Sequence, residues 1–338
     1  MLHVGLDMHK RFSRIVVLDD AGETVEQQTL YHNDREGLVE YFRDKAGKAV
    51  VTVEAVLGWY WLYELLEELG VEMRLVHPRK VRLIAESTVK TDTIDAGTLA
   101  QLERTGFLPE AYIPPREVRD NRELLRYRMS LVRIRTGLKN RVHATLDKLG
   151  ISHPFSDLFG LAGRQFLAGV ELRPVYQRAL DSYLALLDEV AGRIESVTRD
   201  IKAQLKPDPR ADLLMTIPGI AHLTAYLLLC EIGDIRRFSS AKKLCAYGGI
   251  VPKTRQSAEH CWQGRITKEG NRYIRWGLVE AACKAPHKDW KLAQYHRRIA
   301  KRRGPQKARV AVARKLLVAV WHVLTHEEPY ETNYPKTV

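Results

Sequence analysis

The sequence is poor in cysteine and has no long apolar run. Its 338 residues include only four cysteines, and none of these forms the C-x-x-C spacing of a zinc site or a redox pair. The longest apolar stretches, within 223–230 and 316–324, are much shorter than the ~20 residues that a membrane-spanning helix needs. No basic segment followed by an apolar one opens the chain, so a secretion signal is not indicated. We therefore expect a cytoplasmic protein with reduced thiols and no membrane partner.

Positive charge is abundant but unevenly distributed. The net charge is +13, yet residues 1–110 hold 13 lysines and arginines against 19 acids. Residues 255–315 hold 17 basic residues against four acidic ones. An acidic first part joined to a basic remainder fits a metal site served by a body that binds a polyanion. Charge thus indicates nucleic acid as the class of partner. It indicates nothing finer, because structural nucleic-acid-binding proteins share this basic balance.

The first hundred residues predict an α/β domain. Strand patterns occur at 3–9, 12–19, 24–31, 49–54 and 72–77, and helical patterns occur at 34–45, 59–68 and 78–105. The first two strands follow each other too closely for a parallel crossover, so they should pair antiparallel. Three antiparallel strands followed by alternating helix and strand is the order of a ribonuclease H-like fold.

After Pro114-Pro115, strand signals nearly vanish, and we expect an all-α remainder. An arginine-rich helix is predicted over 116–149, and the last part is predicted to be mostly helical from 211 to 326. Apolar residues step by three and four along a second helix, at Leu180, Tyr183, Leu187, Val190, Ile194, Val197 and Ile201. This seam predicts a coiled coil, within the chain or between subunits, or else an ordinary bundle helix. We expect three domains: 1–113, a helical coiled-coil and oligomerisation region at 114–208, and a C-terminal domain at 209–330.

Four acids of the first domain could form a metal site. Asp7 and Glu54 each end an apolar strand, where an unpaired charge is costly. Asp92 and Asp95 lie three apart after Thr91, a good helix cap, so their carboxylates share one helix face. Together these groups could surround two Mg²⁺ ions and clamp a phosphate undergoing in-line displacement. Capping and salt-bridge roles are the alternative interpretation. An actin-like or sugar-kinase ATPase also begins this way, but it needs a second phosphate-binding copy that the sequence lacks.

Two segments of the C-terminal domain suggest contacts with nucleic acid. Pro218-Gly219 lies between helical segments and resembles a helix-hairpin-helix turn, whose backbone N–H groups hold a phosphate, although a plain turn would look alike. Glycine-rich segments further on carry cations suited to phosphodiesters, namely Lys253, Arg255, Arg265, Lys268, Arg272 and Arg275. We also expect RNA contacts along the arginine-rich helix 116–141, including Arg126 and Arg133. Ser257 could attack phosphorus if activated, but a loop serine is more often only a turn residue.

These motifs occur together in the order seen in one known family. They are the four acids, Ile-Pro-Gly-Ile at 217–220, Arg-Phe-Ser-Ser-Ala-Lys-Lys-Leu at 237–244, Gly-Ile-Val-Pro at 249–252 and Gly-Arg-Ile-Thr-Lys-Glu-Gly-Asn at 264–271. Over nearly its whole length the chain resembles transposases of the insertion-sequence 110 family, kin to the Piv DNA invertases.

The resemblance implies a mechanism. It places a RuvC-like set of four acids on Asp7, Glu54, Asp92 and Asp95, which would hold Mg²⁺, and a nucleophilic serine on Ser257. That serine would form a phosphoserine link to DNA. Here it is followed by Ala258 instead of the glycine common in relatives, which leaves Ser239 and Ser240 as fallback nucleophiles.

The resemblance also implies partners. It implies donor and target DNA, a non-coding bridge RNA as guide, and homo-oligomers, with a dimer and an active tetramer, near the nucleoid of a prokaryote. Two other functions stay open. One is a two-metal nuclease of the RuvC type with water as nucleophile, and the other is a non-catalytic architectural binder of nucleic acid.

Overall fold

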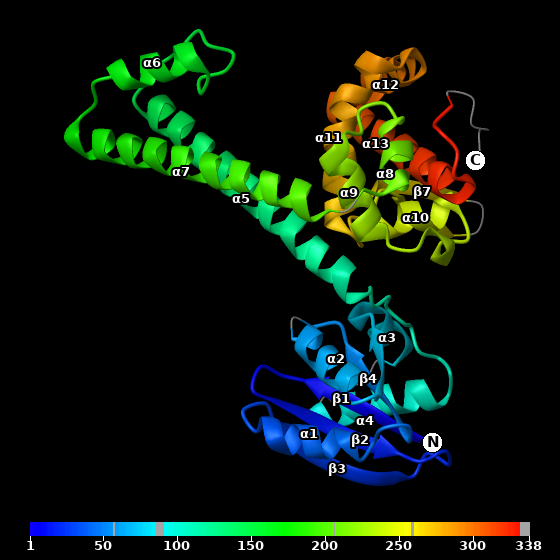
Figure 1. Ribbon diagram of the computed structural model, residues 1–338. Helices are drawn as coiled ribbons and strands as arrows, with labels where there is room; N and C mark the ends of the chain where they lie inside the picture. The colour runs from blue at the N-terminus through cyan, green and yellow to red at the C-terminus, as the bar shows by residue number, and fades with distance from the viewer. Residues whose placement is uncertain (57, 86–90, 206, 258–259, 332–338) are drawn as a thin grey trace. The chain divides into compact units, whose positions relative to one another are not determined.

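The chain consists of two compact units. The computed structural model describes residues 1–331 except 57, 86–90, 206 and 258–259. The first unit is Met1–Ile113 and the second is Pro114–Val338 (Figure 1). Each unit is considered by itself below. The finer division of the second unit at residue 208 stays a prediction.

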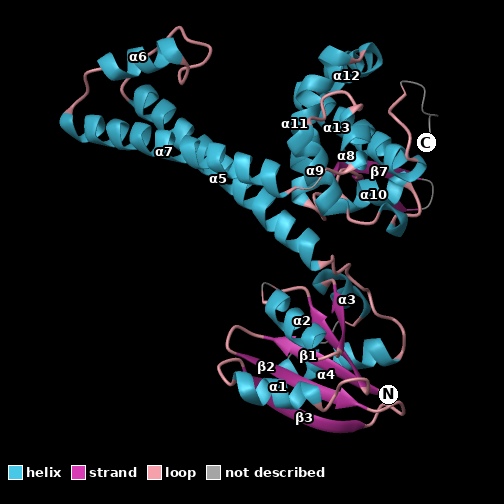
Figure 2. Ribbon diagram, in the orientation of Figure 1, coloured by secondary structure: helices cyan, strands magenta, loops and turns pink. Residues whose placement is uncertain are grey.

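The first unit is built on a mixed five-stranded sheet in the order β3-β2-β1-β4-β5 (Figure 2). The strands are β1 (Leu2–Met8), β2 (Phe12–Leu18), β3 (Thr24–Tyr31), β4 (Ala49–Glu54) and β5 (Glu72–Val76). β1, β2 and β3 pair antiparallel, whereas β1, β4 and β5 pair parallel. The helices are α1 (Arg35–Arg43), α2 (Trp59–Glu68), α3 (Pro78–Ile84) and α4 (Asp92–Arg104). The predicted sheet with helices is confirmed, and its order is consistent with a ribonuclease H-like fold.

Alternation along β1 assigns its two faces to different helices. Val4, Leu6 and Met8 are buried in one core with residues of α1 and α2. The intervening positions face α4 instead. A Cβ atom added at Gly5 would lie 1.8 Å from the carbonyl oxygen of Ala96 in α4. The absence of a side chain at Gly5 therefore lets α4 pack directly on the sheet, on the same face as Asp7.

We expect Gly5→Ala to destabilise the first unit, because the new methyl group meets helix backbone that cannot rotate away. Overpacking of this kind costs about 1–3 kcal/mol of unfolding free energy, or more. Thermal denaturation followed by circular dichroism measures it. Gly97→Ala on α4 is the control, since its Cβ would lie 3.9 Å from Val16, an ordinary contact. The unfolding free energy of that variant should equal that of the wild type or exceed it by up to ~1 kcal/mol. Equal melting of all three proteins would contradict the packing argument.

The second unit is mostly helical. Its helices are α5 (Arg116–Lys148), α6 (Leu161–Gly169), α7 (Pro174–Gln204), α8 (Pro209–Met215), α9 (His222–Ile232), η1 (Ile235–Arg237), α10 (Ala241–Tyr247), α11 (Arg272–Lys288), α12 (Trp290–Arg303) and α13 (Pro305–His326). α5 and α7 lie side by side (Figure 1). Leu187, Val190 and Ile194 of the α7 seam are buried in one core with Leu138 and Val142 of α5. These apolar side chains of the seam are therefore buried by contacts within the chain. Among the described residues, no helix has the length and apolar content needed to cross a membrane.

A β-hairpin interrupts the helices, which the sequence did not predict. β6 (Pro252–Ser257) pairs antiparallel with β7 (His260–Ile266), and Ser257 lies opposite His260. Lys253, Thr254 and Arg255 are exposed, so this strand carries none of the apolar alternation by which a half-buried strand is recognised. The remainder is mostly helical, as predicted, and the hairpin corrects only the expectation that it is all-α.

Candidate metal centre and nucleic-acid interface

The sheet brings the strand-end acids side by side. β1 and β4 are parallel neighbours, with Leu6 paired to Val53. Asp7 and Glu54 are the next residues on the two strands, so both acids lie at the same edge of the sheet. Val51 and Val53 belong to the core on the far face, which places Glu54 on the α4 face together with Asp7.

The first turn of α4 delivers Asp92 to this edge. The Thr91 side chain caps the helix by accepting a hydrogen bond from the backbone N–H of Ile94 at 3.2 Å. Arg14, the cross-strand partner of Asp7, donates from Nε to Thr93 Oγ1 at 3.0 Å and so ties β2 to this turn. The helix dipole alone favours acids in a first turn, so the position beside Asp7 is what singles out Asp92.

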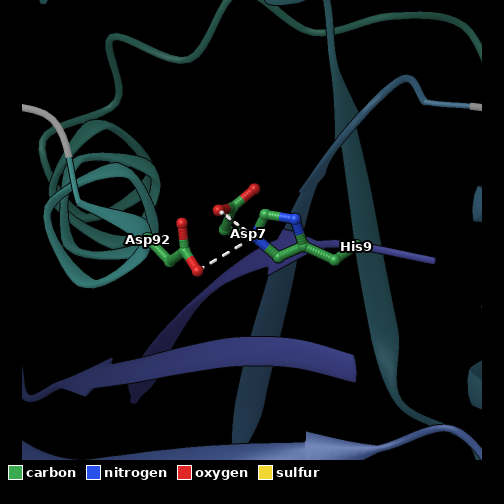
Figure 3. Close-up of side chains that lie close together, drawn as sticks. All are labelled: Asp7, His9 and Asp92. Carbon is green, nitrogen blue, oxygen red and sulfur yellow. Dashed lines mark ion pairs between the residues drawn. The ribbon is translucent and has the colours of Figure 1, made fainter. Parts of the chain in front are cut away.

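His9 lies between the two carboxylates. Its Nε2 atom is 3.1 Å from Asp7 Oδ2 and 3.1 Å from Asp92 Oδ2 (Figure 3). Among the described residues, ligand atoms of these three side chains lie within 4.8 Å of one another, a spacing that could hold a metal ion. The sequence analysis missed His9. The available signal was its position two residues after Asp7, on the same face of an extended strand.

The electrostatics of this cluster favour a bound cation. Burial raises the pKa of Asp7 above its ordinary value, the Asp92 and Asp95 carboxylates raise it further, and His9 partly opposes the shift. The anionic form of Asp7 is therefore disfavoured until positive charge arrives. Carboxylate oxygens are the donors that hard divalent ions such as Mg²⁺ prefer, so the residues present fit such an ion. Of the predicted set, the structure brings Asp7 and Asp92 into direct proximity, places Glu54 on the neighbouring strand end, and sets Asp95 within electrostatic range.

A fully buried acid organises the second unit, and the sequence analysis missed this residue also. Glu231 of α9 has no exposed surface. Arg126 of α5 donates to both of its carboxylate oxygens, from Nε at 2.8 Å and from Nη2 at 2.9 Å. Asn271 donates from Nδ2 to the same carboxylate at 2.7 Å. The Asn271 side-chain oxygen caps α11 by accepting from the N–H groups of Tyr273 and Ile274. Glu231 thereby joins α5, α9 and the start of α11.

Three predicted nucleic-acid contacts converge on one aromatic ring. The guanidinium carbons of Arg126, Arg272 and Arg133 lie 4.6, 5.0 and 5.9 Å from the centre of the Tyr273 ring. Such stacking orients guanidinium groups while leaving N–H donors for other partners. Arg126 is in addition committed to Glu231. Contact of these arginines with nucleic acid stays a prediction.

The remaining predicted cations differ in exposure. Arg255, Arg265 and Lys268 are exposed, and Lys253 is exposed with its Nζ 4.0 Å from the Glu269 carboxylate. Arg275 is partly buried and donates to the Gly248 carbonyl at 2.9 Å. Burial lowers the pKa of Arg275 below its ordinary value.

The Pro218-Gly219 turn joins α8 to α9. Gly219 has φ +85°, and a Cβ atom there would lie 2.4 Å from the Ala281 carbonyl oxygen of α11. Glycine is thus required for backbone geometry and for close packing on α11. A phosphate-binding role for this turn stays a prediction.

The predicted nucleophile lies at the tip of the hairpin. The backbone of Ser257 ends β6, but its side chain lies outside the described residues, as does Ala258. The fallback Ser240 caps α10, accepting at Oγ from the N–H of Lys243 at 3.4 Å. That structural role accounts for Ser240 without any chemistry.

The chain is similar to known transposases along most of its length. Residues 4–151 match the model of a transposase family with a DEDD domain, and residues 211–297 match the transposase IS116/IS110/IS902 family. The transposase for insertion sequence element IS1111A of Coxiella burnetii is 27% identical, covering 97% of this chain and 90% of its own length. The transposase for insertion sequence element IS1328 of Yersinia enterocolitica is 28% identical, covering 95% of this chain and 96% of its own length. The pilin gene-inverting protein of Moraxella bovis is 33% identical over 36% of this chain and 39% of its own length.

Proposed function

The chain belongs to the IS110/IS1111 family of transposases, enzymes of DNA transposition, and we propose that Asp7 and Asp92 hold a divalent metal ion that drives DNA strand cleavage. The observation that carries this proposal is the meeting of their carboxylates at one edge of the sheet, with His9 Nε2 3.1 Å from each. Glu54 and Asp95 complete the acid set from the neighbouring strand end and the same helix turn. Mg²⁺ is the ion we assign to this set.

A metal held here would act as a Lewis acid on a phosphoryl oxygen. The protein's part is to keep the donors in place. Thr91 fixes the start of α4, and Arg14 holds Thr93 against the sheet. Gly5 allows α4 to lie close enough for Asp92 to reach Asp7.

We assign the nucleophile to Ser257. Its Oγ would attack a DNA phosphorus atom, forming a phosphoserine ester and breaking the bond to a deoxyribose oxygen, which leaves as a hydroxyl after taking the serine proton. Reversal with another strand end restores the phosphodiester, so no bond is lost overall. The exposed cations Lys253, Arg255 and Arg265 on the same hairpin support a position beside DNA.

The family resemblance extends the proposal to partners. We assign donor and target DNA, a non-coding guide RNA, and a homo-oligomer that is a dimer or, when active, a tetramer. The strongly basic second unit supports binding of nucleic acid. The arginines around Tyr273 are the contacts that we propose for RNA.

Ser257→Ala tests the nucleophile. With a nicked suicide DNA substrate, the wild-type protein is expected to form a covalent protein–DNA adduct in the presence of Mg²⁺, visible by denaturing electrophoresis. The variant lacks the attacking oxygen and should form none, while Ser240→Ala should form it at a rate near that of the wild type. If the Ser257→Ala protein cleaves DNA undiminished, with water as nucleophile, the chain is a two-metal nuclease instead.

A further inference from the structure

The outward face of α12 carries an unusual concentration of positive charge. From Trp290 to His326 the sequence contains ten lysines and arginines and no acid. Leu292 is buried, whereas four cations on the other side of the helix are exposed, namely Arg297, Arg298, Lys301 and Arg302. We call these four residues the α12 basic face. Within the part of the chain that the structure describes, none of them takes part in an ion pair.

No acid within the helix offsets the repulsion among these cations, although the Arg298 guanidinium carbon lies 5.5 Å from the centre of the Tyr295 ring. Arg297 and Lys301 are four residues apart, as are Arg298 and Arg302, so each pair lies on adjacent turns of one helix face. Like charges at this spacing destabilise a helix. An acid in the intervening positions would offset this repulsion, and α12 contains no acid. An anionic partner would supply the missing counter-charge.

The helix dipole explains only part of this pattern. Cations in the last turn of a helix are favourable, which accounts for Lys301, Arg302 and Arg303. It does not account for Arg297 and Arg298, one turn earlier. Nor does it account for Lys307, which lies in the first turn of α13, where the dipole disfavours a cation.

We propose that the α12 basic face binds the phosphodiester backbone of duplex DNA. The proposal rests on the DNA binding assigned above and adds a surface separate in sequence from the hairpin and from Tyr273. Side chains of several cations along one helix face suit a row of phosphates, and such contacts release counterions without reading sequence. Duplex DNA is the partner assigned because the chain is a transposase.

The test compares two quadruple variants of the full-length protein. The first replaces the α12 basic face, as R297Q/R298Q/K301Q/R302Q. The second, a control with the same loss of charge, replaces four exposed cations of α5 and α7, as K148Q/R178Q/R199Q/K202Q. Binding to a random-sequence DNA duplex and to an RNA hairpin is followed by fluorescence anisotropy between about 50 and 200 mM salt. Circular dichroism confirms that both variants fold.

The slope of log K against log salt decides between the outcomes. Each lost phosphate contact lowers the magnitude of this slope by about 0.9. On duplex DNA we therefore expect the slope of the first variant to be smaller than that of the wild type by about 2–4, and the slope of the control to be smaller by less than about 1. Equal slopes for the two variants would overturn the proposal. A loss confined to the RNA hairpin would overturn it also, because the surface would then serve RNA. Since no cleavage is measured, the result is independent of the metal and serine assignments.

Discussion

Asp7→Asn is expected to abolish metal-dependent DNA cleavage while leaving the fold intact. The side chains have nearly the same shape, but the amide carries no charge to hold a divalent ion. A metal supplies several kcal/mol of charge stabilisation to a phosphoryl transfer, and each ~1.36 kcal/mol is a factor of ten in rate. We therefore expect cleavage to slow by at least about 10²–10³-fold. Cleavage of a labelled DNA substrate at saturating Mg²⁺ measures this effect.

Two further observations make the result specific. Asp44→Asn removes an exposed carboxylate at the end of α1 and should leave the cleavage rate unchanged. Asp7→Asn should retain DNA binding, because the substitution leaves every cation of the basic second unit in place. Cleavage at the wild-type rate without the Asp7 carboxylate would contradict the metal assignment, whereas DNA binding with no cleavage by either protein is what the non-catalytic architectural binder predicts.

Glu231→Gln is expected to destabilise the second unit strongly. The substitution leaves the partly buried Arg126 and the buried Arg122, whose Nε lies 3.8 Å from the carboxylate, against a neutral amide. Removing one partner of a buried ion pair costs about 3–5 kcal/mol. For a unit of this size, each kcal/mol lowers the melting temperature by about 2–4 °C, so we expect a decrease of about 6–20 °C. Differential scanning calorimetry measures the shift.

Arg126 supplies its own matched control. Its Nη1 atom also lies 3.5 Å from the carboxylate of Glu123, whose side chain is 65% exposed. Exposed pairs contribute about 0–1 kcal/mol, so Glu123→Gln should change the melting temperature by no more than about 4 °C. If the two substitutions shifted melting equally, the buried network would not be what joins α5, α9 and α11.

The first unit could be predicted well from the sequence because its signals are local. β1 and β4 contain apolar runs with clear ends, and Asp7 and Glu54 are marked by ending such runs. Thr91 is a typical helix cap and marks the start of α4, where its side chain accepts a hydrogen bond from the N–H of Ile94. Parallel pairing then brings strand ends to one edge by geometry alone.

The features that were missed depend on contacts distant in sequence. Glu231 lies in the apolar helix α9, and its partners are 105 and 40 residues away. Nothing in the neighbouring residues marks it as an ion-pair partner. The β6 strand lacks apolar alternation, since Lys253, Thr254 and Arg255 are all exposed. His9 ends the predicted strand 3–9, and only its proximity to Asp92 of α4 makes it part of a cluster.

The coiled-coil seam shows where a pattern defines a surface but not its partner. The steps of three and four along α7 correctly marked a continuous apolar stripe. Packing within the chain and packing between subunits require the same stripe, so spacing alone could not choose between them. The structure buries Leu187 and Val190 with residues of α5. Oligomerisation through the region 114–208 stays a prediction.

The central claim is that the acids at the edge of the β-sheet hold a divalent cation. Anomalous diffraction from crystals of the full-length protein soaked in Mn²⁺ tests it most directly. The account predicts an anomalous peak between the carboxylates of Asp7 and Asp92, lost in Asp7→Asn crystals. Crystals with no peak there, in which His9 Nε2 still contacts both carboxylates at saturating Mn²⁺, would contradict it.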